Sequence, residues 1–231
     1  VNHNLNPRLF SEQLIYIINH ANDKILIIDL DLLPIIEKII LDCPNVEKLV
    51  ILCSKADLPS TKFSEVISYE ELLLMGSENF EWIKGEETDA CGICYTSGTT
   101  GNPKGVVYTH RSNTLHALTQ AAPDMLNLSS TDTIMPVVPL FHANGWSIAY
   151  TAPLVGSSIV FPGGDLSPSS LYDMLERGVT ITAAVPTVWL LLLNFLESEK
   201  KELSSLKRVV IGGSSCPRSV IEDFQNKYGV R

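Results

Sequence analysis

Nearly continuous apolar runs alternate along the chain with helical stripes of apolar residues. The runs predict strands buried on both faces, at residues 24–29, 47–53, 90–95, 106–108, 133–138, 158–161, 181–184 and 208–211. Apolar side chains spaced three and four apart predict helices between them, at residues 112–122, 169–177, 187–197 and 218–228. Helices that alternate with buried strands are typical of a parallel sheet, so the sequence predicts an α/β fold.

Local signals mark the beginnings of helices in the first part of the chain. Ser68 and Glu71 have the spacing of a capping box, in which each side chain bonds the backbone N–H of the other residue. Asp31 is placed to cap a helix that continues through Ile40, with Pro34 in its first turn. One further helix is predicted near the start from an apolar stripe of Leu14, Ile15, Ile18 and Ala21.

An acidic segment bounded by glycines, residues 76–88, interrupts this rhythm and is predicted to be a linker. We therefore expect a first α/β subdomain at residues 1–88 and a second at residues 89–231. The longest nearly apolar stretch, residues 183–196, contains polar residues and is too short to span a bilayer. No charged and apolar leader opens the chain, so no secretory signal is expected.

The 231 residues include 17 Lys and Arg against 26 Asp and Glu, a formal net charge of −9 at pH 7. This balance argues against nucleic acid or an anionic membrane surface as the main partner. A phosphate ligand would have to be held locally by backbone N–H groups, hydroxyls and a metal ion. Five cysteines, an odd number without a secretory signal, indicate reduced thiols and a cytoplasmic location.

Cys91 and Cys94 form a C-x-x-C pair, but they lie on a predicted strand. Positions three apart on a strand face opposite sides, and no second cysteine or histidine pair accompanies them. We interpret them as core cysteines and not as a zinc or redox site.

The segment 95–105 (YTSGTTGNPKG) lies between two predicted strands and has a composition suited to phosphate. Its glycines allow close backbone approach and positive φ, so that successive N–H groups can converge on an anion. Its hydroxyls add short donors, and one can also ligate Mg²⁺. It is not a Walker A loop, because Lys104 precedes Gly105 instead of a Ser or Thr. The segment therefore predicts a site for a polyphosphate.

Together with Val106, Val107 and Thr109-His110, this segment resembles the phosphate-loop signature of the adenylate-forming superfamily. That superfamily comprises acyl- and aryl-CoA synthetases, firefly luciferase and peptide-synthetase adenylation domains. Residues 138–146 (VPLFHANGW) resemble its second core motif, and residues 211–217 (IGGSSCP) its adenine segment. Residues 6–9 and 19–21 resemble the fatty-acyl-CoA synthetase branch. The resemblance implies a layered αβαβα core of largely parallel sheets flanked by helices.

The resemblance also implies roles for residues of the phosphate loop. Those that would wrap the β- and γ-phosphates of ATP are Thr96, Ser97, Gly98, Thr99, Thr100 and Gly101. Thr96 would in addition lie near Mg²⁺. Lys104 would help neutralise pyrophosphate as a catalytic residue, and the alternative for it is a solvated surface lysine.

A second group of residues would contact the adenine and the acid. Gly213 and Ser214 would lie against the adenine, where a position without a side chain lets a flat base pack on backbone. His142, Ala143 and Trp146 would line the acyl pocket beside the α-phosphate, with His142 as a second catalytic residue. The alternatives are a core histidine at 142 and a fixed core tryptophan at 146.

The activity implied by the resemblance is that of an ATP-dependent acid–thiol ligase, which activates a carboxylic acid as acyl-AMP and transfers it to CoA. The expected acid is fatty or otherwise apolar; an aryl-CoA synthetase or a peptide-synthetase adenylation domain is the alternative. The required small molecules are the acid, ATP, Mg²⁺ and CoA, and a homodimer is compatible with the family.

The family pattern continues with a Y-G-x-T-E motif, a ribose-binding Asp and a distal Lys, none of which the chain contains. We therefore expect a core fragment that is inactive alone. Two readings of other classes stay open: a nucleotide-binding module without turnover, and a scaffold that binds no nucleotide.

Overall fold

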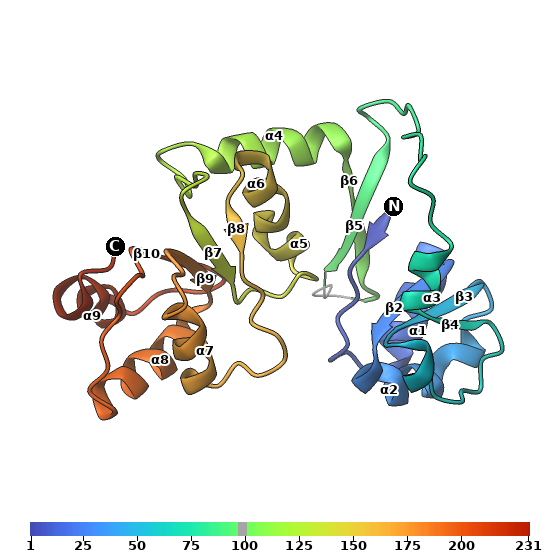
Figure 1. The fold of residues 1–231 in the computed structure, drawn as a ribbon, viewed down its shortest axis with the longest axis horizontal. Helices are drawn as coiled ribbons and strands as arrows, with labels where there is room; N and C mark the ends of the chain where they lie inside the picture. The colour runs from blue at the N-terminus through green and yellow to red at the C-terminus, as the bar shows by residue number, and fades with distance from the viewer. Residues whose placement is uncertain (97–100) are drawn as a thin grey trace. The chain divides into compact units, whose positions relative to one another are not determined.

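The structure is a computed structural model that describes residues 1–96 and 101–231 (Figure 1). The chain divides into two compact units, Val1–Thr109 and His110–Arg231, called unit 1 and unit 2 below. Within the described ranges, no helix is long and apolar enough to cross a membrane.

Unit 1 contains a parallel sheet of order β2-β3-β4. Its strands are β2 (Ile25–Asp29), β3 (Lys48–Leu52) and β4 (Val66–Ser68). Helices α1 (Ser11–Ala21) and α2 (Leu33–Ile39) share a core with this sheet, in which Leu14 and Ile18 of α1 meet Leu26 and Leu49 of the strands. The predicted helical stripe therefore faces a core, as its spacing indicated.

Helix α3 (Tyr69–Leu74) follows β4 and begins with the predicted capping box. The backbone N–H of Glu71 donates to Ser68 Oγ at 3.2 Å, and the backbone N–H of Ser68 donates to Glu71 Oε2 at 3.2 Å. The prediction for this helix start is confirmed.

A second sheet of unit 1 has the order β1-β5-β6. Its strands are β1 (Asn2–His3), β5 (Ala90–Thr96) and β6 (Lys104–Thr109). Strand β1 runs parallel to β5, and β5 runs antiparallel to β6 (green in Figure 1). The last pair of that hairpin joins Thr96 to Lys104, so the two ends of the predicted phosphate loop are neighbours.

Unit 2 is built on a parallel sheet of order β10-β9-β7-β8. Its strands are β7 (Thr133–Pro136), β8 (Ser158–Ile159), β9 (Ile181–Ala184) and β10 (Arg208–Ile211). Its helices are α4 (His110–Ala121), α5 (Ala143–Trp146), α6 (Ile148–Val155), α7 (Pro168–Leu175), α8 (Pro186–Ser198) and α9 (Arg218–Tyr228).

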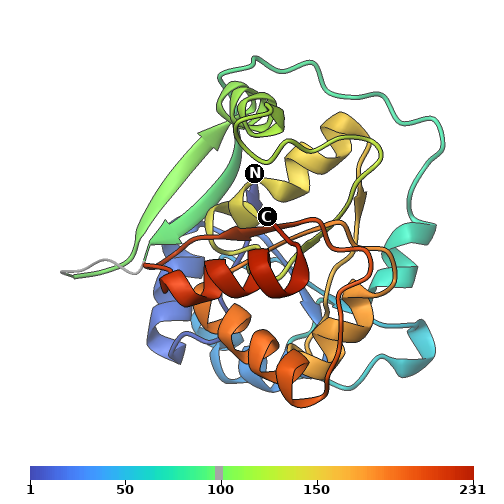
Figure 2. The ribbon, with the colours of Figure 1, turned by 90° about the vertical axis from the view of Figure 1, so that its left-hand side faces the viewer.

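Alternate residues of the central strands face two different cores. Ile134 and Ile181 pack with α6 on one face, whereas Met135 and Ala184 pack with α7, α8 and α9 on the other. Figure 2 shows α8 and α9, in orange and red, side by side. Because both faces are buried, the strands read as continuous apolar runs, and the predicted α/β class with largely parallel sheets is confirmed.

Two departures from the predicted elements have local causes. Strands β1 and β4 are two and three residues long, too short for periodicity to mark them. The prediction that Asp31 caps a helix through Ile40 is wrong: short 3₁₀ turns at Leu30–Leu32 and Ile40–Asp42 flank α2. The cap of α2 is Leu32, without a side-chain bond, because Pro34 stands in the first turn and the helix starts next to it.

The acidic segment 76–88 contains neither helix nor strand, as expected of a linker. The boundary between the units, at Thr109, nevertheless differs from the division after residue 88 that the sequence suggested. The pairing of β5 with β1 explains the difference, because it holds the β5–β6 hairpin in unit 1.

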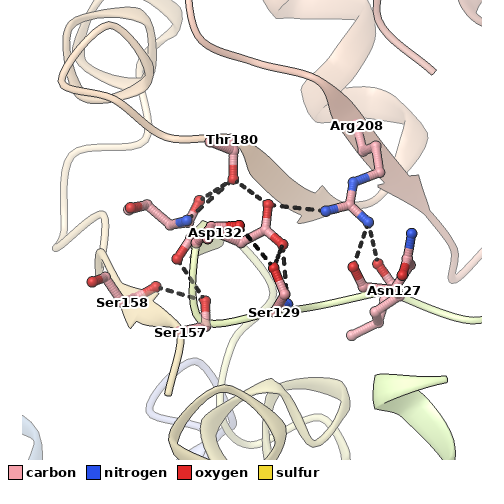
Figure 3. Close-up of polar contacts among 10 residues, drawn as sticks. Asn127, Ser129, Asp132, Ser157, Ser158, Thr180 and Arg208 are labelled. Atoms are coloured by element: carbon pink, nitrogen blue, oxygen red, sulfur yellow. Dashed lines mark hydrogen bonds and ion pairs between the residues drawn. The ribbon is translucent and has the colours of Figure 1, made fainter. Parts of the chain in front are cut away.

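A polar cluster joins the amino ends of β7, β9 and β10 (Figure 3). Asp132 immediately precedes β7, Thr180 precedes β9, and Arg208 opens β10. One carboxylate oxygen of Asp132 accepts hydrogen bonds from Arg208 Nη2 at 2.9 Å and from Thr180 Oγ1 at 2.8 Å. The other accepts bonds from the backbone N–H and the hydroxyl of Ser129, both at 3.0 Å. The cluster therefore ties three strand starts to one buried carboxylate.

These contacts change the titration of the carboxyl group. Burial alone would raise the pKa of Asp132, but hydrogen bonds from Thr180, Arg208 and Ser129 outweigh burial and hold that pKa below its ordinary value. Ionised Asp132 therefore adds stability at pH values above the pKa it has in the unfolded chain. That contribution is lost as the pH falls through the lower pKa of the folded state.

We expect Asp132→Asn to lower the free energy of unfolding of unit 2 by about 2–4 kcal/mol at neutral pH, because Arg208 then lacks its counter-charge. The difference from wild type should shrink below about pH 4. Urea unfolding followed by tryptophan fluorescence measures both effects. The control is Glu222→Gln, which breaks the exposed ion pair with Arg218 and should cost under about 0.5 kcal/mol. Equal losses in both variants, or a difference independent of pH, would contradict this account.

Candidate functional site

The carboxyl ends of β7, β9 and β10 lie at the edge of the sheet opposite the Asp132 cluster. The chain leaves β7 toward α6 on one face of the sheet, and it leaves β9 toward α8 on the other face. In an open α/β sheet, a ligand crevice forms where successive connections diverge to opposite faces. The segments that follow these strands, at residues 137–147, 185 and 212–217, are therefore where a site is expected.

The short element α5 after β7 is not a regular right-handed helix: together with Ser147 it forms a left-handed turn. Its residues all have positive φ: 42° at Ala143, 50° at Asn144, 63° at Gly145, 54° at Trp146 and 61° at Ser147. The left-handed conformation costs a residue other than glycine about 1–2 kcal/mol. Strained backbone of this kind concentrates at functional sites and persists only where the surroundings hold it in place.

The strained turn places Trp146 against the segment that follows β10. A Cβ atom at Gly212 would stand 2.8 Å from Cη2 of the Trp146 indole, so the ring packs directly on glycine backbone. The same ring lines a cavity of about 630 Å³. Other lining residues include Ile148, the last three residues of β10, and His116 and Gln120 of α4. The lining is mainly apolar, and the volume suits a small-molecule site.

His142 and Ala143 lie at the start of the turn, and both are exposed. The ring of His142 stands 4.7 Å from the ring of Phe141, centroid to centroid. An exposed imidazole at this edge is not in the position of a core histidine. Ala143 lines the cavity together with Trp146. The acyl-pocket role that the resemblance implies for these two residues stays a prediction.

Gly213 and Ser214 follow β10 and are exposed at the same edge. Gly213 has a φ of +83°, and a Cβ atom there would stand 3.0 Å from Cγ1 of Val185, which follows β9. The positive φ favours glycine at 213, and an added Cβ would also crowd the side chain of Val185. The role of this pair toward adenine stays a prediction.

The described part of the predicted phosphate loop lies at the end of the β5–β6 hairpin in unit 1. Thr96 and Lys104 are exposed there, and Gly101 has a φ of +103°, which glycine alone adopts readily. The remaining candidates lie outside the described residues, so their roles stay predictions: Ser97, Gly98, Thr99 and Thr100.

Within the described ranges, no group of three or more His, Cys, Asp or Glu side chains could hold a metal ion. Cys91 and Cys94 are in no disulfide and lie on β5, where Cys94 is buried and Cys91 half-buried. The interpretation as a core cysteine therefore holds for Cys94 and only in part for Cys91. Thr96 offers a single hydroxyl. A Mg²⁺ ion beside it would take most of its ligands from nucleotide phosphates and water, as this ion commonly does.

The sequence did not predict the contacts of three residues near the carboxyl edge. Gly212 belongs to the predicted adenine segment, but its contact with an indole 66 positions earlier in the chain carries no sequence signal. Gln120 and Thr151, whose side chains bond to the turn and to each other, also carry none. The hydrogen bond between Gln120 and Trp146 joins residues 26 positions apart in the chain, and the bond between Thr151 and Gln120 joins residues 31 positions apart.

A larger cavity, of about 960 Å³, lies in unit 1 and is lined mainly by apolar residues, among them those of β2 and α1. His3 and Asp23, whose side chains lie 2.9 Å apart, also line it. It contains none of the predicted site residues, and so the cavity beside Trp146 is the candidate site.

The family described as AMP-binding enzyme matches residues 1–231, so the chain belongs to that family.

Two curated relatives are similar over 229 residues, which are 99% of this chain and 42% of each relative. The medium-chain-fatty-acid–CoA ligase of Ectopseudomonas oleovorans is 47% identical, and the 3-methylmercaptopropionyl-CoA ligase of Ruegeria pomeroyi is 43% identical. A solved anthranilate CoA ligase in complex with anthranoyl-AMP superimposes with a TM-score of 0.87 at 25% identity, covering 99% of this chain and 43% of that chain. The chain thus spans less than half the length of these relatives.

We expect Gly212→Ala to displace the Trp146 indole, because the added Cβ would stand 2.8 Å from the ring. ¹⁹F NMR of the protein labelled with fluorotryptophan resolves this ring, with Trp146→Phe assigning its signal. The Trp146 signal should move while those of Trp82 and Trp189 stay. Gly164→Ala is the control, since a Cβ there meets nothing within 4 Å. A Trp146 signal that does not move in Gly212→Ala contradicts the described packing.

Proposed function

We propose that the chain is the nucleotide- and acid-binding part of an ATP-dependent acid–CoA ligase. The observation that carries the proposal is the packing of Trp146 on Gly212, because it puts an apolar cavity beside the segment expected to hold adenine. An enzyme that joins an acid to AMP needs both pockets in adjoining positions. The names of the relatives, which are CoA ligases of three different acids, support the same reaction.

The reaction has two steps. A carboxylate oxygen attacks the α-phosphorus of ATP, so that an acyl–phosphate bond forms, the bond to the β-phosphate oxygen breaks and pyrophosphate leaves. The thiol of CoA then attacks the acyl carbon, a thioester forms and AMP leaves, while the thiol proton passes to solvent. The protein contributes chiefly alignment of the reacting groups and stabilisation of charge on the phosphates.

Each candidate residue has a place in this scheme. The hydroxyls and N–H groups of 96–101 would hold the β- and γ-phosphates, and Lys104 would neutralise charge on the departing pyrophosphate. Gly213 and Ser214 would contact adenine. His142 would stand beside the α-phosphate, and Ala143 and Trp146 would contact the acyl chain. Mg²⁺, bound near Thr96, would supply positive charge to the phosphates.

The acid is proposed to be fatty or otherwise apolar. The cavity beside Trp146 is lined mainly by apolar side chains, and the relative at 47% identity is named for medium-chain fatty acids. An aryl acid, as in the anthranilate ligase at 25% identity, is the less favoured alternative. A cytoplasmic location and a homodimer remain predictions.

The reaction class is tested with the complete ligase that contains this chain. ATP–pyrophosphate exchange should require a carboxylic acid, and addition of CoA should yield acyl-CoA and AMP. If neither straight-chain nor aromatic acids support ATP–pyrophosphate exchange, the proposal is contradicted.

We expect the double change Thr99→Val and Thr100→Val to slow ATP–pyrophosphate exchange in the complete ligase at least about tenfold at subsaturating ATP. Each lost hydrogen bond to a charged phosphate costs about 1.5–3 kcal/mol. Thr88→Val, in the exposed linker, is the control and should leave exchange unchanged. Unaltered exchange in the double variant, with folding intact by circular dichroism, rejects the phosphate role of these hydroxyls.

We expect Trp146→Ala to shift the preference of the complete ligase toward longer or bulkier acids, because it removes a wall of the cavity. Trp146 is only partly buried, whereas Trp189 is fully buried, so its loss should cost less than the roughly 3–5 kcal/mol of a core aromatic. The measurement is kcat/KM over acids of increasing length, with melting temperatures beside it. Trp82→Ala, at an exposed linker position, is the control. A uniform loss of activity with a large fall in melting temperature indicates a core tryptophan instead.

A further inference from the structure

Two side chains outside the left-handed turn 143–147 hold its backbone. Gln120 of α4 donates from Nε2 to the carbonyl oxygen of Trp146 at 2.7 Å. The hydroxyl of Thr151 in α6 lies 2.9 Å from Gln120 Oε1 and 3.1 Å from the carbonyl oxygen of Ser147. Because a hydroxyl has one proton, Thr151 donates either to Gln120 or to Ser147. The pair of side chains, called the Gln120–Thr151 clamp below, holds the carbonyl of Trp146 through Gln120.

The clamp is buried. Gln120 is 8% exposed and Thr151 is 0% exposed, and the helices that carry them, α4 and α6, lie against each other (Figure 1). A buried amide or hydroxyl is costly unless it is hydrogen-bonded, and here both ends of the Gln120 amide are bonded within the protein. These two side chains therefore connect α4 and α6 to the carbonyl of Trp146 in the turn.

Because the carbonyl group of Trp146 is held, the adjoining Cα atom that carries the indole side chain is held as well. The carbonyl carbon is bonded to the Cα that carries the ring, so an anchored peptide sets the direction of the Cα–Cβ bond. Only the two side-chain torsions then remain to place the ring, which rests on Gly212. Gln120 lines the same cavity, and so its bond connects one wall of that cavity to another.

We propose that Gln120 and Thr151 are positioning residues, which hold the left-handed turn and thereby set the position of the Trp146 indole in the acyl cavity and the acids that the cavity accepts. The part that concerns acid selection rests on the proposed function. The part that concerns the position of the indole does not.

Loss of the clamp has a definite structural consequence. Ala143, Trp146 and Ser147 prefer right-handed backbone, so a released turn relaxes away from positive φ. The indole then leaves Gly212, and the wall of the acyl cavity changes. Within the described residues, Gly213 and Ser214 form no hydrogen bond to the clamp, so adenine contacts are spared.

The position of the indole is tested with three variants of this chain labelled with fluorotryptophan. Thr151→Val removes the hydroxyl and keeps the shape, Gln120→Met removes the amide at similar length, and Thr151→Ser keeps the hydroxyl. The first two should move or broaden the Trp146 ¹⁹F signal, and Thr151→Ser should leave it in place. The signal of Trp189, fully buried in the other core of unit 2, reports whether the unit is folded.

Acid selection is tested with the same variants of the complete ligase. Thr151→Val and Gln120→Met should change KM for the acid, or the ranking of acids by length, by about three- to tenfold, as expected for one or two neutral hydrogen bonds. KM for ATP should change less than about twofold, and Thr151→Ser should behave as wild type. A residue that only supports folding would lower activity with all acids alike.

The outcomes separate the two claims. An unmoved Trp146 signal in Gln120→Met, with the Trp189 signal in place, overturns the clamp, and this variant decides alone where Thr151→Val does not fold. A moved signal with unaltered acid preference in an active ligase overturns the role in selection. A wild-type ligase that activates no acid overturns the proposed function, while the ¹⁹F result still decides whether the clamp holds the indole.

Discussion

Parallel pairing of β7, β9 and β10 is the constraint on which the rest of unit 2 depends. In a parallel sheet the amino ends of the strands share one edge and the carboxyl ends share the other. Asp132, at the start of β7, can therefore bond partners at the starts of β9 and β10, although Thr180 and Arg208 come 48 and 76 positions later. The same pairing delivers the segment that holds Trp146 and the segment that holds Gly212 to one edge.

The two edges are built from different kinds of interaction. At the amino edge, charge and hydrogen bonds are satisfied within the protein, with Asp132 accepting bonds through both oxygens. At the carboxyl edge, the backbone takes up positive φ at Trp146 and Gly213, and the side chain of His142 is exposed. Strain can persist at one edge because packing and polar contacts elsewhere determine the fold. The stabilising Asp132 cluster and the proposed binding edge thus lie at opposite ends of the strands.

Sequence reasoning reached the fold class because the strands are buried on both faces, which leaves continuous apolar runs such as 181–184. It reached the candidate segments because glycine and hydroxyl motifs are local. The left-handed turn could not be predicted from the sequence, because alanine and tryptophan, found here at Ala143 and Trp146, rarely adopt positive φ. The clamp of Gln120 and Thr151 could not be predicted either. Those features depend on contacts between residues far apart in the chain, and periodicity or motif spacing does not encode them.

The central claim is that the proposed acyl cavity and the predicted adenine segment adjoin across the contact of Trp146 with Gly212. A crystal structure of the complete protein with a stable acyl-AMP analogue tests it most directly. The account predicts the acyl chain in the cavity beside Trp146 and the adenine against Gly213 and Ser214. An acyl chain outside that cavity, or adenine bound away from Gly213 and Ser214, would contradict it.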